Sequence, residues 1–348
     1  MARILITHPI YEGTIVKLSL KKIHPSLQAR ADLSPIPEEV FYARNKSEEI
    51  FYIPGIAIKQ QPNEKHDPSL EILRLALETI KPDVLIAGNN AVPGKAIAAW
   101  RAAVESDKRL LAIRRGVDTR AIDKLAASEY SVAVGNLPGI NSPFVAKHMI
   151  KHLKLEDAKP GSKIAVVGVG NIGKNVAIEA IKLDLSVHLL SPSLQEFSSK
   201  RSEILARKGI PSEKVICAQS LEQALEGASY LSIAVPWEKP SGGTHVDTIG
   251  VNHIESLAAN AKIASASVPR IFTEQALTLM NDRIKQGKIY VRIDSSKRRA
   301  VEAKQNYPYL DACHDQAFAC AECQEELDNA MLEKARAFVS NSVLELVK

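Results

Sequence analysis

A glycine-rich turn is the segment of the chain whose residue types point most directly to a chemistry. The sequence GVGNIG at residues 168–173 follows an apolar run, residues 163–167, and precedes a helical pattern, residues 174–182. In such a strand–turn–helix unit the first glycine permits a tight turn, the second lets the backbone approach a pyrophosphate, and the third allows close packing of helix on strand. Free N–H groups at the start of the helix attract phosphate. The residues expected to bind a dinucleotide here are Gly168, Gly170, Asn171, Ile172 and Gly173.

The end of the next expected strand, residues 185–190, bears on the choice of dinucleotide. A site that prefers NAD usually carries an aspartate or glutamate there, which binds the ribose hydroxyls. This chain has Ser191 instead, followed by Ser193 and then by Lys200 and Arg201. Without a carboxylate to repel it, a 2′-phosphate can lie against these hydroxyl groups and one basic side chain. We therefore expect NADP or NAD, with NADP slightly favoured. The alternative is that Ser191 binds the ribose of NAD weakly and the basic pair is solvated.

The elements that must position this turn are strands and helices in alternation, which predict an α/β fold with parallel sheets and right-handed crossovers. Apolar runs predict the strands and amphipathic runs predict the helices. A chain of 348 residues is too long for one ordinary core, so two domains are expected. The expected strands include residues 3–7, 83–87, 109–113, 131–134, 163–167 and 185–190, and the expected helices include residues 69–80, 92–103, 142–153, 174–182 and 322–347.

Composition and charge exclude several classes of function. Hydrophobic residues make up 45% of the chain and charged residues 24%, which are ordinary values for soluble globular proteins. The formal charge of +5 comes with no basic stripe interleaved with aromatic residues, so no nucleic-acid partner is expected. No apolar run approaches the ~20 residues that span a bilayer, and no signal peptide is evident at the N-terminus. The sequence therefore predicts a cytoplasmic protein without a membrane partner.

Cysteine and histidine spacing gives no reason to expect a metal. The four cysteines are Cys217, Cys313, Cys320 and Cys323. Three of them lie near His314, but the spacing from Cys313 to Cys320 fits no common zinc finger, and the CxxC pair looks helical. His148 and His152 are four residues apart on one expected helix without a nearby acidic ligand. We therefore expect no metal site.

Ordered motifs along the chain suggest a family. They are residues 114–123, residues 134–141, the glycine turn, Ala234-Val235-Pro236, residues 267–270, Asp294 and His314. In this order they resemble the D-2-hydroxyacid dehydrogenase family, the formate and glycerate dehydrogenase-like proteins. The resemblance runs from about residue 83 to the C-terminus and is faint before it.

The resemblance implies two Rossmann-like doubly wound domains, the first split and completed by the C-terminal helix. Residues 1–115 with 313–348 would form a flavodoxin-like substrate domain. Residues 116–312 would form the dinucleotide-binding Rossmann domain, and a homodimer built through it is implied.

The resemblance also implies roles for individual residues. Arg270 matches the arginine that binds and polarises a 2-oxo acid, and His314 matches the histidine that exchanges a proton with its ketone oxygen. Guanidinium suits the first task because its planar fork holds a carboxylate, and imidazole suits the second because its pKa lies near neutrality. Cofactor-binding positions are Ser191, Ser193, Val235, Pro236, Ser267 and Asp294, and substrate-binding positions are Asn89, Asn90 and Ala91.

Departures from the family pattern leave alternatives open. The glutamate that pairs with the family's histidine is replaced by Arg299, and Glu302 is a nearby substitute. We expect an NAD(P)-dependent oxidoreductase that transfers a hydride between a nicotinamide cofactor and a small 2-oxo or 2-hydroxy acid. One alternative is a non-catalytic or weakly catalytic dinucleotide sensor on the same fold. Another is a different NAD(P)-dependent reaction on an anionic substrate recruited by residues 297–299.

Overall fold

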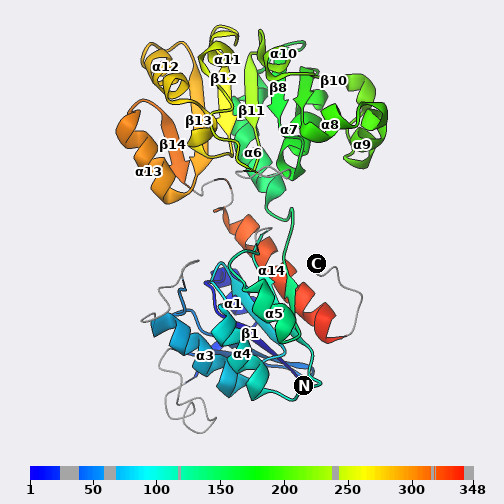
Figure 1. The fold of residues 1–348 in the computed structure, drawn as a ribbon, viewed down its shortest axis with the longest axis vertical. Helices are drawn as coiled ribbons and strands as arrows, with labels where there is room; N and C mark the ends of the chain where they lie inside the picture. The colour runs from blue at the N-terminus through cyan, green and yellow to red at the C-terminus, as the bar shows by residue number, and fades with distance from the viewer. Residues whose placement is uncertain are drawn as a thin grey trace. The chain divides into compact units, whose positions relative to one another are not determined.

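The chain forms two compact units in a computed structural model that describes residues 1–23, 39–58, 68–116, 119–236, 243–314, 317 and 319–340. The first unit comprises Met1–Ile140 and Ala321–Lys348, and the second comprises Asn141–Cys320. Each unit contains one seven-stranded sheet among its described residues, and helices cover the faces of both sheets (Figure 1).

The first sheet has a doubly wound parallel core with an antiparallel edge. Its strand order is β2-β3-β4-β1-β5-β6-β7, and β3 runs antiparallel to both β2 and β4. Its strands are β1 (Ala2–Ile6), β2 (Lys21–Lys22), β3 (Phe41–Arg44), β4 (Glu48–Tyr52), β5 (Val84–Gly88), β6 (Leu110–Arg114) and β7 (Val132–Gly135). Its helices are α1 (Glu12–Lys17), α3 (Pro68–Ile80), α4 (Gly94–Ala103), α5 (Lys124–Glu129) and α14 (Ala321–Val339).

The core of the first unit follows from continuous apolar runs. Every residue of β5 and β6 is buried, as expected for central parallel strands covered on both faces. Trp100 on α4 is fully buried in this core, and its Nε1 donates to the carbonyl oxygen of Pro82 at 2.9 Å. Helix α3 ends at Ile80, because Lys81 takes a left-handed conformation (φ 52°) and precedes that proline.

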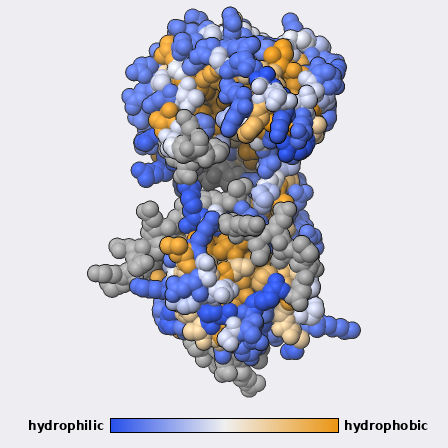
Figure 2. All heavy atoms as spheres, turned by 45° about the vertical axis from the view of Figure 1, so that its right-hand side comes forward, coloured by the Kyte–Doolittle hydropathy of each residue, from blue (hydrophilic) through white to orange (hydrophobic). Residues whose placement is uncertain are grey.

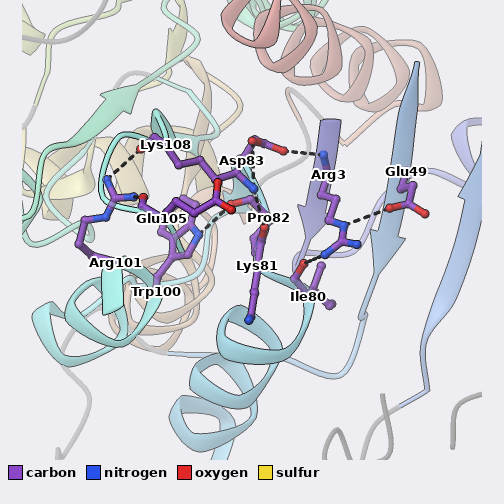
Figure 3. Close-up of polar contacts among 10 residues, drawn as sticks. All are labelled: Arg3, Glu49, Ile80, Lys81, Pro82, Asp83, Trp100, Arg101, Glu105 and Lys108. Carbon is purple, nitrogen blue, oxygen red and sulfur yellow. Dashed lines mark hydrogen bonds and ion pairs between the residues drawn. The ribbon is translucent and has the colours of Figure 1, made fainter. Parts of the chain in front are cut away.

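A polar network joins the amino ends of β1, β4 and β5 (Figure 3). The backbone N–H of Arg3 donates to Asp83 Oδ2 at 2.7 Å, and its guanidinium donates to Glu49 and to the carbonyl oxygen of Ile80, both at 3.0 Å. Lys108 pairs with Asp83 at 3.2 Å. These bonds fix the end of the sheet opposite to the one where ligands bind in open α/β sheets.

Helix α14 completes the first unit, as the resemblance predicts. The carboxylate of Asp328 is buried and accepts hydrogen bonds from the backbone N–H of Tyr11 at 2.7 Å and from Thr14 Oγ at 3.2 Å. Arg336 holds the buried Glu48 with hydrogen bonds of 2.6 to 3.2 Å. The C-terminal helix is thereby tied to the N-terminal strands and to α1.

The second sheet is fully parallel, in the order β10-β9-β8-β11-β12-β13-β14. Its first six strands have the dinucleotide-binding order 3-2-1-4-5-6. The strands are β8 (Lys163–Val167), β9 (Ser186–Leu190), β10 (Val215–Cys217), β11 (Tyr230–Ile233), β12 (Lys262–Ser265), β13 (Tyr290–Ser295) and β14 (Asp311–His314). The helices are α6 (Ser142–Leu153), α7 (Asn171–Lys182), α8 (Pro192–Glu196), α9 (Arg201–Arg207), α10 (Leu221–Leu225), α11 (Val251–Glu255), α12 (Glu274–Lys285) and α13 (Lys297–Asn306).

The second unit has an apolar layer on each face of its sheet. In β8, Ile164 and Val166 belong to one buried cluster, and Ala165 and Val167 belong to the other. This alternation is the two-residue period of a strand covered by helices on both sides. Hydrophilic residues predominate on the face of this unit drawn in Figure 2. No helix among the described residues is long and apolar enough to cross a membrane.

The boundaries between the units fall later in the chain than the expected 115/116 and 312/313. Strand β7 pairs in parallel with β6, so the first sheet extends past residue 116. Strand β14 pairs in parallel with β13, so residues 313 and 314 lie in the second sheet. Backbone hydrogen bonding therefore assigns the strand of His314 to the second unit.

Because Trp100 is fully buried, we expect Trp100→Ala to lower the free energy of unfolding of the first unit by about 3–5 kcal/mol. The matched control, Leu125→Ala on α5, changes a side chain that is 86% exposed and should stay within about 0.5 kcal/mol. Hydrogen exchange of the β5 amides measures the free energy of unfolding of the first unit alone. A loss below about 1 kcal/mol for the tryptophan variant would contradict the packing described here.

Candidate functional site

The glycine turn between β8 and α7 leaves no space for side chains at two of its three glycines. Gly168 has a φ of 92°, and a Cβ there would lie 2.5 Å from the carbonyl oxygen of Ala234. A Cβ on Gly173 would lie 1.8 Å from the carbonyl oxygen of Gly168. At Gly170, by contrast, a Cβ would meet nothing within 4 Å. Two glycines therefore close the turn, and the third borders open space.

The open space at Gly170 fits a dinucleotide pyrophosphate. Gly170 is the N-cap of α7, and no side-chain hydrogen bond caps this helix end. The first N–H groups of a helix lack partners within the helix and carry a partial positive charge. Asn171 and Ile172 provide the first residues of α7. An anion can therefore approach the backbone here without displacing a side chain.

The turn lies where the order of the sheet reverses, which is the usual ligand position in open α/β sheets. Strand β8 is paired with β9 on one side and with β11 on the other. Val235 and Pro236 follow β11 at the same edge. The Ser267 hydroxyl donates to the carbonyl oxygen of Val235 at 2.8 Å and accepts from its N–H at 3.1 Å. Ser267 thus fixes the loop after β11 against the loop after β12.

Two serines follow β9, and the basic side chain of Arg201 further along this segment already has protein partners. Ser191 is buried, and its Oγ lies 3.2 Å from Ser193 Oγ. Arg201 donates to the carbonyl oxygen of Leu194 at 2.6 Å and to Gln219 Oε1 at 3.1 Å. The position where an NAD site usually has a carboxylate therefore carries a pair of hydroxyl groups.

Arg270 lines a cavity of about 520 Å³. It belongs to a short 3₁₀ helix, Pro269–Ile271, and its side chain is 68% exposed. Its ion pair with Glu302 on α13 is long, at 3.9 Å. Arg299 also lines the cavity. The carboxylate that the sequence offered as a substitute partner for His314 therefore lies next to Arg270. The side chain of His314 is outside the described residues.

Asp294 lies between two donors on neighbouring segments. Its Oδ1 accepts from Cys313 Sγ at 3.1 Å, and its Oδ2 accepts from the N–H of Ala317 at 2.8 Å. Burial and the hydrogen bond to this carboxylate raise the pKa of the Cys313 thiol to about 12. The thiol is therefore protonated at neutral pH. Asp294, which the resemblance places at the cofactor, has both carboxylate oxygens hydrogen-bonded to the protein.

His148 on α6 joins this pair, and the sequence reasoning did not connect them. Its Nε2 is buried and has no hydrogen-bond partner in the described part of the chain. Burial lowers the pKa of His148, which favours the neutral imidazole. The only sequence signal is its place between Val145 and Met149, both buried on α6. Such a pattern indicates that a residue is half-buried but not what it faces.

In the first unit, the side chain of Asn90 connects three backbone segments. Its Nδ2 donates to the carbonyl oxygens of Thr7 at 2.6 Å and Ile56 at 2.9 Å. Its Oδ1 accepts from the N–H of Ile58 at 3.3 Å. This amide therefore holds the carboxyl ends of β1 and β5 together.

The two residues next to Asn90 differ in their exposure to solvent. Asn89 is exposed, whereas Ala91 is buried and its N–H donates to the carbonyl oxygen of Ile58 at 3.2 Å. Among the three residues expected to bind substrate, Asn89 is the one that offers an exposed side chain.

Comparison with known sequences gives a partial match. No protein-family model matches the chain. Erythronate-4-phosphate dehydrogenase from Marinobacter nauticus is 29% identical over 146 residues, which cover 38% of this chain. The match spans 36% of the length of that protein.

Comparison with solved structures covers the whole chain. The NAD-complexed D-isomer specific 2-hydroxyacid dehydrogenase of Lactobacillus delbrueckii ssp. bulgaricus has a TM-score of 0.65 at 11% identity, covering 100% of both chains. Apo D-lactate dehydrogenase of Escherichia coli has a TM-score of 0.63 at 13% identity, covering 99% of this chain and 98% of that one. NAD⁺-bound 3-phosphoglycerate dehydrogenase of Entamoeba histolytica has a TM-score of 0.60 at 15% identity, covering 100% and 98%. These likenesses confirm the two-domain α/β fold and the resemblance that the sequence predicts.

The geometry of the turn predicts different effects on stability for alanine substitutions at two glycines that are three residues apart. Gly173→Ala places a Cβ into a carbonyl oxygen, so we expect a loss of about 1–3 kcal/mol in unfolding free energy. Gly170→Ala has open space and a φ of −79° that alanine adopts, so its stability should stay within about 0.5 kcal/mol of the parent. Thermal unfolding followed by circular dichroism compares the two. Equal effects would show that the turn is not built as described.

Proposed function

We propose that this chain, which has the fold of the D-2-hydroxyacid dehydrogenases, is an NAD(P)-dependent oxidoreductase that acts on a small 2-oxo or 2-hydroxy acid. The observation that carries the proposal is the uncapped start of α7 beside the open space at Gly170, located at the reversal point of a parallel sheet. Nicotinamide cofactors in the solved structures of this fold, such as the NAD-complexed Lactobacillus enzyme, support the choice of ligand.

The chain's own residues would hold the cofactor in three places. The backbone from Gly168 to Gly173 would bind the pyrophosphate, and Ser191 with Ser193 would meet the adenosine ribose. Val235, fixed by Ser267, would border the bound dinucleotide. The nicotinamide ring, when bound, supplies or accepts the hydride.

Arg270 would bind the substrate carboxylate and polarise the 2-oxo group. Its exposed guanidinium and the long 3.9 Å pair with Glu302 support this role, because a bidentate carboxylate is a stronger partner than a solvated ion pair at that distance. His314 would exchange the proton with the ketone oxygen, a task that suits a group titrating near neutrality. In this proposal Asn89 supplies the exposed side chain of the substrate loop, with Asn90 and Ala91 shaping it.

Finer parts of the proposal concern cofactor preference, assembly and location. We infer a slight preference for NADP, because Ser191 replaces the usual carboxylate and the basic residue Arg201 follows at the start of α9. A homodimer formed through the dinucleotide-binding unit and a cytoplasmic location complete the proposal.

A phosphorylated hydroxy acid is a second candidate substrate. The Marinobacter relative is an erythronate-4-phosphate dehydrogenase, and erythronate 4-phosphate is such a compound. In this chain α13 begins with Lys297, Arg298 and Arg299, and its first turn contains no acidic residue. Three cations at the positive end of a helix attract anionic groups such as a phosphate.

The test is oxidation of NADH and NADPH with a panel of 2-oxo acids that includes phosphorylated members, followed by near-ultraviolet absorbance. We expect His314→Ala to lower kcat by about 10²–10⁴-fold because the proton donor is lost. We expect Arg270→Lys to lower kcat/KM by about 100-fold, because an ammonium cannot form the bidentate contact. The matched control is Arg207→Lys on α9, which is exposed and pairs only weakly with Glu203 at 3.8 Å.

Three results would contradict parts of the proposal. Turnover that survives in His314→Ala would remove that residue from the reaction while leaving the enzyme. Equal turnover in the Arg270 and Arg207 variants would remove the substrate anchor. Binding of both coenzymes without turnover on any acid would favour a dinucleotide sensor.

A further inference from the structure

Three potential metal ligands meet on one face of the second sheet. His148 belongs to α6, Asp294 to β13 and Cys313 to β14. Their ligand atoms all lie within 4.8 Å of one another. Asp294 and Cys313 are directly opposite each other in the parallel pair of β13 and β14. A nitrogen, an oxygen and a sulfur donor are thus brought together from segments far apart in sequence.

The unpaired nitrogen of His148 is a second, independent observation that points to a ligand at this cluster. Its Nε2 is enclosed by protein and makes no hydrogen bond to any described residue. A buried polar atom without a partner costs about 1–3 kcal/mol, so natural proteins rarely leave one. A cation in contact with this lone pair would remove that cost.

Two other pairs of polar groups on this face, among the described residues, contact each other. Arg292 donates to both oxygens of Asp311 at 2.7 Å, which cancels two charges. His152 Nδ1 lies 3.0 Å from the hydroxyl of Tyr290. Of the described residues, Cys313 and Asp294 lie beside His148 and can supply negative charge to a cation, as a thiolate and a carboxylate.

We propose that His148, Asp294 and Cys313 bind one Zn²⁺ ion, with water in a fourth position. Zinc accepts imidazole, carboxylate and thiolate ligands in tetrahedral sites, whereas magnesium and calcium take oxygen ligands. One carboxylate and one thiolate balance the charge of the ion. On binding, the Zn–S bond replaces the S–H bond, and the thiol proton passes to solvent. Asp294 Oδ2 can keep its hydrogen bond from Ala317.

The distances require only a small adjustment. Tetrahedral ligands at about 2.0–2.3 Å from zinc lie about 3.3–3.7 Å apart. The Sγ–Oδ1 separation of 3.1 Å is already close to this value. The widest separation, at most 4.8 Å, must close by about 1 Å, which small side-chain rotations supply. The bound ion would fix the carboxyl ends of β13 and β14 against α6.

The test uses the full-length chain, stripped with a chelator and then titrated with Zn²⁺ or Co²⁺. We expect one Zn²⁺ per chain and a rise in Tm that saturates at one equivalent, because an ion that binds only the folded state stabilises it. The Co²⁺ form should show a thiolate-to-cobalt charge-transfer absorption. Cys313→Ser should abolish that absorption, and His148→Asn should weaken Zn²⁺ binding by about 100-fold.

Matched controls lie in the same sheet. Cys217→Ser on β10 and His188→Asn on β9 remove the same side-chain types outside the cluster, and both should bind Zn²⁺ like the parent. Absence of a thiolate band in the parent protein, or parent-like Zn²⁺ affinity in the double Cys313 and His148 variant, would overturn the proposal. So would a band lost only in Cys320→Ser/Cys323→Ser, which would assign the metal to the CxxC pair.

Discussion

The contact between α7 and the end of β8 is the constraint on which the rest of the second unit depends. A Cβ on Gly173 would lie 1.8 Å from the carbonyl oxygen of Gly168, so helix and turn meet without any side chain between them. This contact brings the start of α7 to the carboxyl edge of the sheet, next to the loop after β11. The exposed helix end, and with it the proposed dinucleotide site, follows from the absence of two Cβ atoms.

The carboxyl edge of this sheet is also held by hydrogen bonds that local sequence patterns do not predict. Ser267 connects the loops after β11 and β12, and Asp294 joins β13 to β14 and to Ala317. In the first unit Asn90 performs the equivalent task for three backbone segments. These polar residues, at the sheet edge where ligands bind in such folds, therefore stabilise the structure through hydrogen bonds within the protein. Arg270, with its long pair to Glu302, is more available to a substrate than they are.

The sequence predicts well what depends on neighbours along the chain. The glycine turn, the apolar strands and the helices that follow them are local patterns, and the strands β8 and β9 lie within a residue of their expected bounds. It predicts less well what depends on distant pairing. The boundaries between the two units lie later in the chain than expected, because β7 pairs with β6 and β14 pairs with β13. The hydrogen-bond partners of the Asn90 side chain are more than thirty residues away along the chain. His148 lacked an acidic neighbour in sequence, although Asp294 lies beside it in space.

The most direct test of the account is titration of the parent chain and Gly170→Ala with NADH and NADPH, followed by nicotinamide fluorescence. If the backbone at Gly170 borders the pyrophosphate, the added methyl group should weaken binding of both coenzymes by about tenfold or more, equal to 1.4 kcal/mol. The exposed variant Glu213→Ala should bind like the parent. Unchanged affinity in a folded Gly170→Ala protein, or no binding to the parent, would contradict the central claim that this turn is a dinucleotide site.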